Sequence, residues 1–301
     1  MSPSRPLTLP DALPALRRAR LVKPPISGYW IERERPVGWK VLERTEVLGG
    51  AIELIADPTG LRHRYQLLPW EHSIDRSTGA LLAKAVAKVR SEPPSSMSET
   101  EAELRAHVLS VLRSMALPMA IEDEFTDAVM RNTLGIGVLD VILRDPRVED
   151  VFVDAPCQQT RVYLTLNQSG PGHVFGRCET NVIVSEGEMG ALVGRLKYRS
   201  GRPFSRSTPV LETDLGDSRV RATALCPPLS PDGLALALRR RSDLPWTLLR
   251  LAEHGAIDEV AAGLPSFLID GRASILICGA RGSGKSSLLS ALLFEFPLDQ
   301  R

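Results

Sequence analysis

The stretch Gly279-Ala280-Arg281-Gly282-Ser283-Gly284-Lys285-Ser286 decides the fold of the C-terminal part of this chain. Its spacing matches the Walker A pattern G-x-x-x-x-G-K-[ST]. The residues just before it, Ala273 to Cys278, predict a buried strand, and Lys285 to Phe294 predict an amphipathic helix. A strand, a glycine-rich turn and a helix in this order are typical of a phosphate-binding loop.

The residue types in this stretch suit the binding of a nucleoside triphosphate. Glycines can adopt positive φ and leave room for phosphates, while backbone N–H groups and the following helix N-terminus attract their negative charge. Lys285 is the expected catalytic cation at the β- and γ-phosphates, and the Ser286 hydroxyl is the expected Mg²⁺ ligand. A glycine turn before an ordinary helix is the simpler alternative, but the flanking pattern favours a site for ATP and Mg²⁺. The predicted nucleotide-binding residues are Gly279, Ala280, Arg281, Gly282, Ser283, Gly284, Lys285, Ser286 and Ser287.

Composition excludes several other classes of protein. The 301 residues carry 37 Lys+Arg against 36 Asp+Glu, so the bulk charge argues against a nucleic-acid partner. Four scattered cysteines without a C-x-x-C pair predict neither a disulfide framework nor a metal site. No apolar run reaches the roughly 18 residues of a membrane span, and the N-terminus has no apolar signal segment. We therefore expect a cytoplasmic protein without a transmembrane segment.

Proline-rich and glycine-rich stretches divide the chain into four predicted parts. Residues 1–28 are a mobile tail, and 29–95 are a small α+β region. Residues 96–245 are an α+β domain, an antiparallel sheet with flanking helices, and 246–301 hold linker helices and the start of a RecA-like α/β core. The predicted strands are 39–43, 51–56, 63–68, 148–154, 160–166, 180–184, 210–215, 218–225 and 234–240. The predicted helices are 73–89, 98–115, 121–134, 138–143, 189–196, 247–253 and 257–270.

Short motifs outside the phosphate-binding loop carry a resemblance to a known family. They are Gly135–Asp140, Arg144–Val151, Gly201–Pro203, Ser207–Leu211, Asp217–Arg219, Leu238–Arg240, Leu244–Pro245 and Phe296–Arg301. In this order, from about Tyr65 to Arg301, the chain resembles the type II/type IV secretion ATPase superfamily, which drives secretion machines, pili and archaella. Tyr65–Glu71 resembles a segment of the archaeal branch. Arg281 and Ser286 depart from the family's usual Thr, and Ser218 departs from its usual Gly.

The resemblance implies what the whole protein does. It implies a homohexameric ATPase at the cytoplasmic face of a membrane, docked on a membrane platform protein of a secretion or pilus system. Hydrolysis would drive domain motion. Arg219 and Arg239 match arginines that approach the phosphates in this family, a role that suits the planar, always-charged guanidinium. The alternative is that both belong to a solvated strand face.

The resemblance also implies catalytic parts that come after the phosphate-binding loop. These are an Asp for Mg²⁺, a Glu that activates water and a histidine motif, whereas only residues 287–301 follow Ser286. We therefore expect a chain truncated just after the loop, which binds ATP without turnover. The apolar face of the loop's helix would lack a sheet to pack on, at a cost of about 1.5–3 kcal/mol per leucine. The leucines of this face are Leu288, Leu289, Leu292 and Leu293. The stretch after Pro245 is therefore expected to be weakly stabilised.

Two alternative functions stay open. One is a P-loop NTPase of another class, such as a DNA-handling motor. The other is a non-enzymatic docking module that uses its nucleotide site only to set its conformation. The sequence leaves open which machine, whether secretion system, pilus or archaellum, the protein would serve.

Overall fold

The structure, a computed structural model, divides the chain into two compact units. The N-terminal unit is Met1–Arg241 and the C-terminal unit is Ser242–Arg301. The described residues are 21–23, 26, 28–92, 101–115, 122–166, 176–215, 220–241, 245–280 and 283–297. Most of the predicted tail, residues 1–28, therefore lies outside the described residues.

Nine strands of the N-terminal unit form one sheet, in the order β10-β11-β12-β6-β7-β8-β5-β4-β3. The strands are β3 Lys40–Val47, β4 Gly50–Ala56, β5 His63–Pro69, β6 Val148–Val153, β7 Tyr163–Leu166, β8 Gly176–Thr180, β10 Val210–Asp214, β11 Val220–Leu225 and β12 Ala235–Arg240. The pair of β5 and β8 is parallel, so the sheet is mixed and not wholly antiparallel as predicted. The same pair joins residues 29–95 and 96–245, two predicted regions, in one sheet.

A second, smaller sheet consists of β1 (Leu21–Val22), β2 (Tyr29–Glu32) and β9 (Val182–Val184), in the order β1-β2-β9. Asn181 connects it to the large sheet. Its buried amide donates to Leu67 O at 2.9 Å and Glu32 O at 3.1 Å, and accepts from Leu67 N at 2.8 Å. A buried amide needs such partners, because an unpaired one would lose its hydrogen bonds to water.

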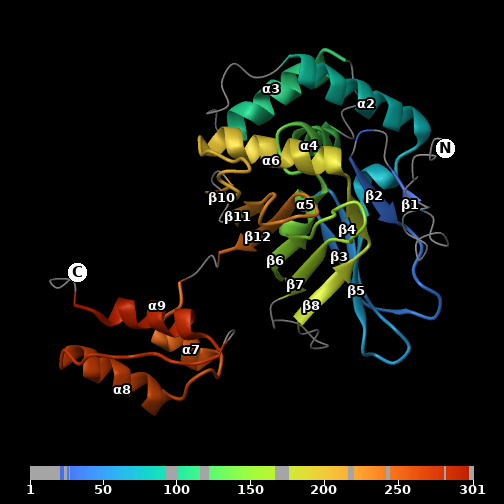
Figure 1. The fold of residues 1–301 in the computed structure, drawn as a ribbon. Helices are drawn as coiled ribbons and strands as arrows, with labels where there is room; N and C mark the ends of the chain where they lie inside the picture. Colours follow the sequence, from blue (N-terminus) through green and yellow to red (C-terminus); the bar gives the residue numbers. More distant parts are fainter. Residues whose placement is uncertain are drawn as a thin grey trace, which may run out of the picture. The chain divides into compact units, whose positions relative to one another are not determined.

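Helices lie together on one side of the large sheet (Figure 1). They are η2 Trp70–His72, α2 Arg76–Ser91, α3 Glu101–Arg113, α4 Glu122–Thr133, α5 Val138–Leu143 and α6 Glu186–Ser200. Local signals set their ends. Asp75 caps α2 and Ser185 caps α6 by accepting backbone N–H bonds, and α6 ends at Gly201, whose φ is 63°.

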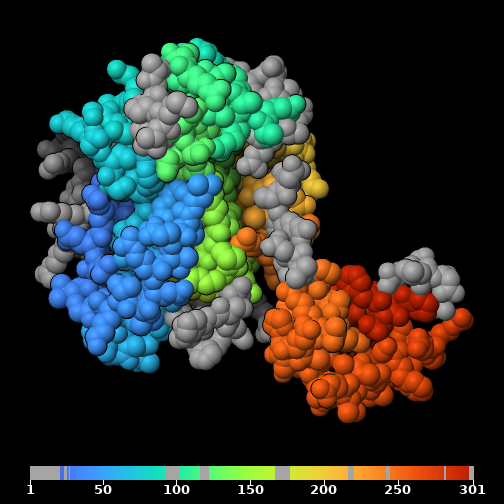
Figure 2. Space-filling model, turned by 180° about the vertical axis from the view of Figure 1, so that it is seen from behind, coloured from blue at the N-terminus to red at the C-terminus, as the bar shows by residue number. Residues whose placement is uncertain are grey.

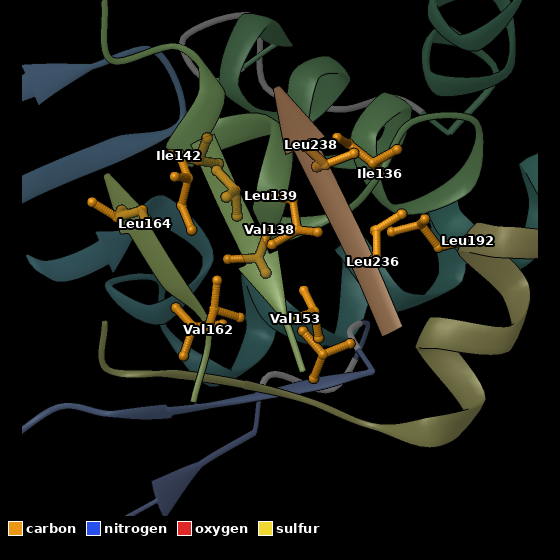
Figure 3. Packing of buried hydrophobic residues seen from close by; sticks show 14 of the residues in the cluster. Ile136, Val138, Leu139, Ile142, Val153, Val162, Leu164, Leu192, Leu236 and Leu238 are labelled. Carbon is orange, nitrogen blue, oxygen red and sulfur yellow. The ribbon is translucent and has the colours of Figure 1, made fainter. Parts of the chain in front are cut away.

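Two hydrophobic clusters stabilise this unit. The first lies between α5, α6 and the sheet, and Figure 3 shows Val138, Leu139 and Ile142 of α5 among side chains of the strands below. The second joins α2, α3 and α4 around Phe125 and Leu112. Both clusters follow the apolar periodicity of their helices, since each helix buries one face.

The C-terminal unit contains α7 Leu248–Glu253, α8 Glu259–Asp270 and α9 Lys285–Glu295. Their side chains form one packed body (orange to red in Figure 2). The predicted strand Ala273–Cys278 is wrong: these residues form no strand, and all but Ile277 are exposed. A buried strand needs neighbouring strands for its backbone hydrogen bonds and side chains, and the described part of this unit has none.

The predicted apolar face of α9 is only half covered. Leu292 is buried and Leu288 is partly buried, whereas Leu289 and Leu293 are 53% and 56% exposed. Elsewhere in the unit Phe267 is 73% exposed. In the described part of the chain, no helix is long and apolar enough to cross a membrane.

Candidate functional site

The predicted phosphate-binding loop leads directly into α9. Gly284 has a φ of 81°, a left-handed conformation that favours glycine, and it stands at the N-cap of the helix. Its carbonyl oxygen accepts from Leu288 N at 2.9 Å, and no side chain caps the helix. The first N–H groups of a helix have no acceptor within it. The backbone of Lys285, Ser286 and Ser287 therefore presents donors where an anion can bind.

Lys285 makes a contact within the predicted loop. The ammonium of Lys285 donates a hydrogen bond to Ala280 O. The Lys285 side chain therefore lies over the loop in which the sequence predicts phosphate binding. Ser286 is exposed. A Cβ on Gly279 would lie 2.5 Å from Ser283 Oγ, so a larger residue there requires Ser283 to move. Arg281 and Gly282 lie outside the described residues.

Arg239, one of the two predicted arginines, is on β12 of the N-terminal unit. Its side chain is 79% exposed, and its Nε lies 3.9 Å from Asp150 Oδ1 on β6. Asp150 is fixed in turn by Thr165, whose hydroxyl donates to Asp150 Oδ2 at 3.2 Å and accepts from Asp150 N at 3.1 Å. Arg219, the other predicted arginine, lies outside the described residues.

The neighbouring arginines have different environments. Arg240 donates to the backbone oxygen of buried Asp145 at 2.8 Å, which gives it a structural contact. Arg241 pairs with Asp214 at 3.0 Å, and Arg221 lies 3.8 Å from the same carboxylate. The run of arginines is therefore not one uniform solvated face. Arg221 and Arg241 share the Asp214 carboxylate, whereas Arg240 has a backbone acceptor of its own.

Sequence reasoning missed a buried charge network. Arg131, 1% exposed at its side chain, pairs with Glu71 and Asp127. Asp127 also accepts from Arg144, and Glu71 accepts from Tyr29 Oη at 2.6 Å. Asp127 and Arg131 are four residues apart, and opposite charges at this spacing lie close together on a helix. This spacing is the signal in the sequence that could have revealed part of the network. The network joins α4 to η2 and β2, so its role is structural.

Two other groups in the N-terminal unit have unusual pKa values. Burial raises the pKa of the Asp140 carboxyl to about 6, although Ile136 N donates to it at 2.9 Å. Burial lowers the pKa of His72 to about 4. His72 lines a pocket of about 450 Å³ beside the β3–β4 turn, together with Gly49 and Trp70. No predicted site residue lines this pocket.

Similarity to known proteins extends over about half of this chain. A scan against protein-family models found no match. The chain is 31% identical over 172 residues to the putative conjugal transfer protein Rv3659c of Mycobacterium tuberculosis, covering 56% of this chain and 46% of that protein. It is 29% identical over 172 residues to the uncharacterized protein MJ0900 of Methanocaldococcus jannaschii, covering 57% of this chain and 30% of that protein. The chain thus spans less than half the length of these relatives.

A solved structure was also found. It is the VirB11 ATPase from the Brucella suis type IV secretion system in complex with sulphate, 21% identical over 54% of each chain, with a TM-score of 0.31. This overlap is too low to support an argument. The quoted motifs resemble the type II/type IV secretion ATPase superfamily, and the chain is similar in sequence to proteins named for conjugal transfer. Because the relatives are both archaeal and bacterial, the archaeal branch stays a prediction.

Proposed function

We propose that this chain is the ATP-binding portion of a hexameric ATPase that serves a secretion, pilus or archaellum machine. The observation that carries the proposal is the left-handed Gly284 directly before α9, with Lys285 and Ser286 in its first turn. This geometry supplies backbone donors, a cation and a hydroxyl within four residues. The resemblance to the secretion ATPase superfamily supports the choice of ATP.

Each loop residue has a distinct proposed role. The backbone N–H groups around Gly284 bind phosphate oxygens, and Lys285 neutralises the β- and γ-phosphates. Ser286 completes the coordination of Mg²⁺ that arrives with the nucleotide. Hydrogen bonds to charged groups contribute about 1.5–3 kcal/mol each, so removing the Lys285 ammonium should cost roughly that much binding free energy.

The larger assembly is part of the proposal. The functional protein is a homohexamer on a membrane platform protein at the cytoplasmic face, and Arg219 and Arg239 contact the nucleotide phosphates. Support comes from the family resemblance and from the exposed fork of Arg239. Two relatives are named for conjugal transfer, so a DNA-handling motor stays the alternative proposal. DNA-stimulated ATPase activity in a longer protein would favour that alternative.

Nucleotide binding to the purified chain tests the core of the proposal. Titration calorimetry with ATP and Mg²⁺ should give a measurable Kd, and Lys285→Ala should weaken it at least about tenfold, the equivalent of one charge-assisted hydrogen bond. Lys84→Ala, on the exposed face of α2, is the matched loss of a lysine. Equal affinity in Lys285→Ala and in the parent chain would refute the site. A turnover assay on the same samples separates binding from hydrolysis.

A further inference from the structure

The pocket beside the β3–β4 turn is built from both sheets of the N-terminal unit. The small sheet contributes Ile31 of β2, and Arg33 directly follows that strand. The large sheet contributes Glu46, Ala51 and Leu68, which lie opposite one another in the register of β3, β4 and β5. Directly paired residues of antiparallel strands project from the same face of a sheet, so these three residues form one wall.

Two further elements bound the pocket. The short helix η2 contributes Trp70 and His72, and the first turn of α4 contributes Glu124. The volume of about 450 Å³ lies within the roughly 300–1,000 Å³ that is usual for small-molecule sites. Ile31 and Leu68 add apolar surface to the ring of Trp70. The pocket therefore has room for a small organic molecule with an apolar body.

The charges that line the pocket are balanced in number but not all paired. Arg44 and Glu46 form an ion pair at 3.0 Å. The other two charged side chains are those of Arg33 and Glu124. Neither has an ion-pair or hydrogen-bond partner within the described part of the chain. One free guanidinium and one free carboxylate thus line the same pocket.

His72 does not add a third charge to the pocket. Burial lowers its pKa to about 4, so the imidazole is neutral near pH 7. Both of its ring nitrogens are buried, and neither has a hydrogen-bond partner among the described residues. A neutral ring contributes no attraction for a ligand of either sign. Selection by charge therefore falls to Arg33 and Glu124.

The wall beside the β3–β4 turn is fixed by the buried charge network. A Cβ on Gly49 would lie 2.8 Å from Arg131 Nη1 and 3.0 Å from Asp127 Oδ2, so the Gly49 backbone lies directly against the network. Arg144 donates to Leu48 O at 2.8 Å. Leu48 and Gly49 both line the pocket. A wall that is held in this way needs little ordering when a ligand binds.

A ligand with both a carboxylate and an ammonium would satisfy both free charges. A guanidinium binds a carboxylate through two parallel donors, and a carboxylate accepts hydrogen bonds from an ammonium. We propose that this pocket binds a free amino acid with an apolar side chain, its carboxylate at Arg33 and its ammonium at Glu124. The apolar side chain lies against Trp70 and Leu68. A ligand with only one charge leaves the other protein charge unpaired.

The test is an NMR titration of the full chain with L-phenylalanine, followed at the indole N–H of Trp70, which Trp70→Phe identifies. L-Phenylalanine should shift this signal with a Kd below about 1 mM. Two analogues each lack one charge: 3-phenylpropanoate has no ammonium, and 2-phenylethylamine has no carboxylate. Both should bind at least about tenfold more weakly, because each loses one charge-assisted contact.

Two substitutions assign each ligand charge to its residue. Arg33→Gln should raise the Kd of L-phenylalanine at least about tenfold and leave that of 2-phenylethylamine within about twofold. Glu124→Gln should weaken L-phenylalanine to a similar degree and leave 3-phenylpropanoate within about twofold. Arg62→Gln, at an exposed arginine in the β4–β5 turn, is the matched loss of a cation outside the pocket and should change no Kd.

Three results would overturn the proposal. They are an unshifted Trp70 signal at about 10 mM L-phenylalanine, equal affinity in Arg33→Gln and the parent chain, or analogues that bind as tightly as the amino acid. Arg33→Lys is a second variant at the same position, which keeps the charge and loses the planar pair of donors. Its Kd should fall between those of the parent chain and Arg33→Gln.

Discussion

The two units of this chain bury their apolar side chains very differently. In the N-terminal unit, Leu139 and Ile142 of α5 are no more than 1% exposed, between the sheet and its helices. In the C-terminal unit, Val260, Phe267 and Leu276 are 82%, 73% and 87% exposed. The first unit has the packing of an independent core. The second has the local geometry of a phosphate-binding loop without comparable packing around it.

This difference shows which parts of a site are local. Gly284 and the first turn of α9 need only a few residues to present backbone donors, so the loop forms without a sheet beside it. A buried strand needs distant partners, and Ala273–Cys278 has none among the described residues. In this chain, the local geometry at Gly284 therefore does not depend on how much apolar surface the C-terminal unit buries.

The largest expected effect is on the buried charges of the N-terminal unit. Arg131→Met should lower its free energy of unfolding by about 3–5 kcal/mol, because Glu71 and Asp127 would keep buried charges with fewer partners. Urea unfolding followed by tryptophan fluorescence measures the loss. Arg105→Met is the control, since its pair with Asp123 is exposed and worth about 0–1 kcal/mol. Similar losses in both variants would contradict the structural role of the network.

A pair of leucine substitutions compares the two units directly. Leu139→Ala should cost about 2–5 kcal/mol, since it leaves a cavity beside the sheet. Leu289→Ala, at a side chain that is 53% exposed, should change stability by no more than about 0.5 kcal/mol. Thermal or urea unfolding measures both. A loss above about 2 kcal/mol for Leu289→Ala would show that α9 is packed more fully than the structure has it.

A smaller, pH-dependent effect is expected at Asp140. Its pKa of about 6 lies above the ordinary 3.8, so ionisation costs stability, which is lost as pH rises through this interval. Asp140→Asn removes that cost and keeps an oxygen for Ile136 N. The variant should gain up to about 3 kcal/mol over the parent above pH 7 and nothing near pH 4. A gain that is constant with pH would show that Asp140 does not titrate in this range.

Short-range signals were the ones that the sequence could supply. The glycine-lysine pattern predicts the loop from eight consecutive residues. The caps Asp75, Ser185 and Gly201, which the sequence analysis did not name, also act within four residues. The parallel pair of β5 and β8 joins residues 64–65 to 179–180, so no local pattern announces it. The Arg131 network likewise assembles residues from four separate segments.

Arg221 and Arg239 illustrate the same limit. They are eighteen positions apart in the sequence, and only the register of β11 and β12 places them side by side. The family resemblance matches Arg219 and Arg239 and ranks Arg221 behind them. The proximity of Arg221 and Arg239 depends on the pairing of these strands within the whole sheet.

Hydrogen exchange with and without ATP and Mg²⁺ tests the central claim most directly. Without nucleotide, amides in residues 274–293 should exchange much faster than those of β4, β6 and β12, because the C-terminal unit buries little apolar surface. Adding ATP and Mg²⁺ should slow exchange at residues 283–288 in the parent chain and leave Lys285→Ala unchanged. Strong protection of 274–293 without nucleotide, or no response to ATP in the parent chain, would contradict the account.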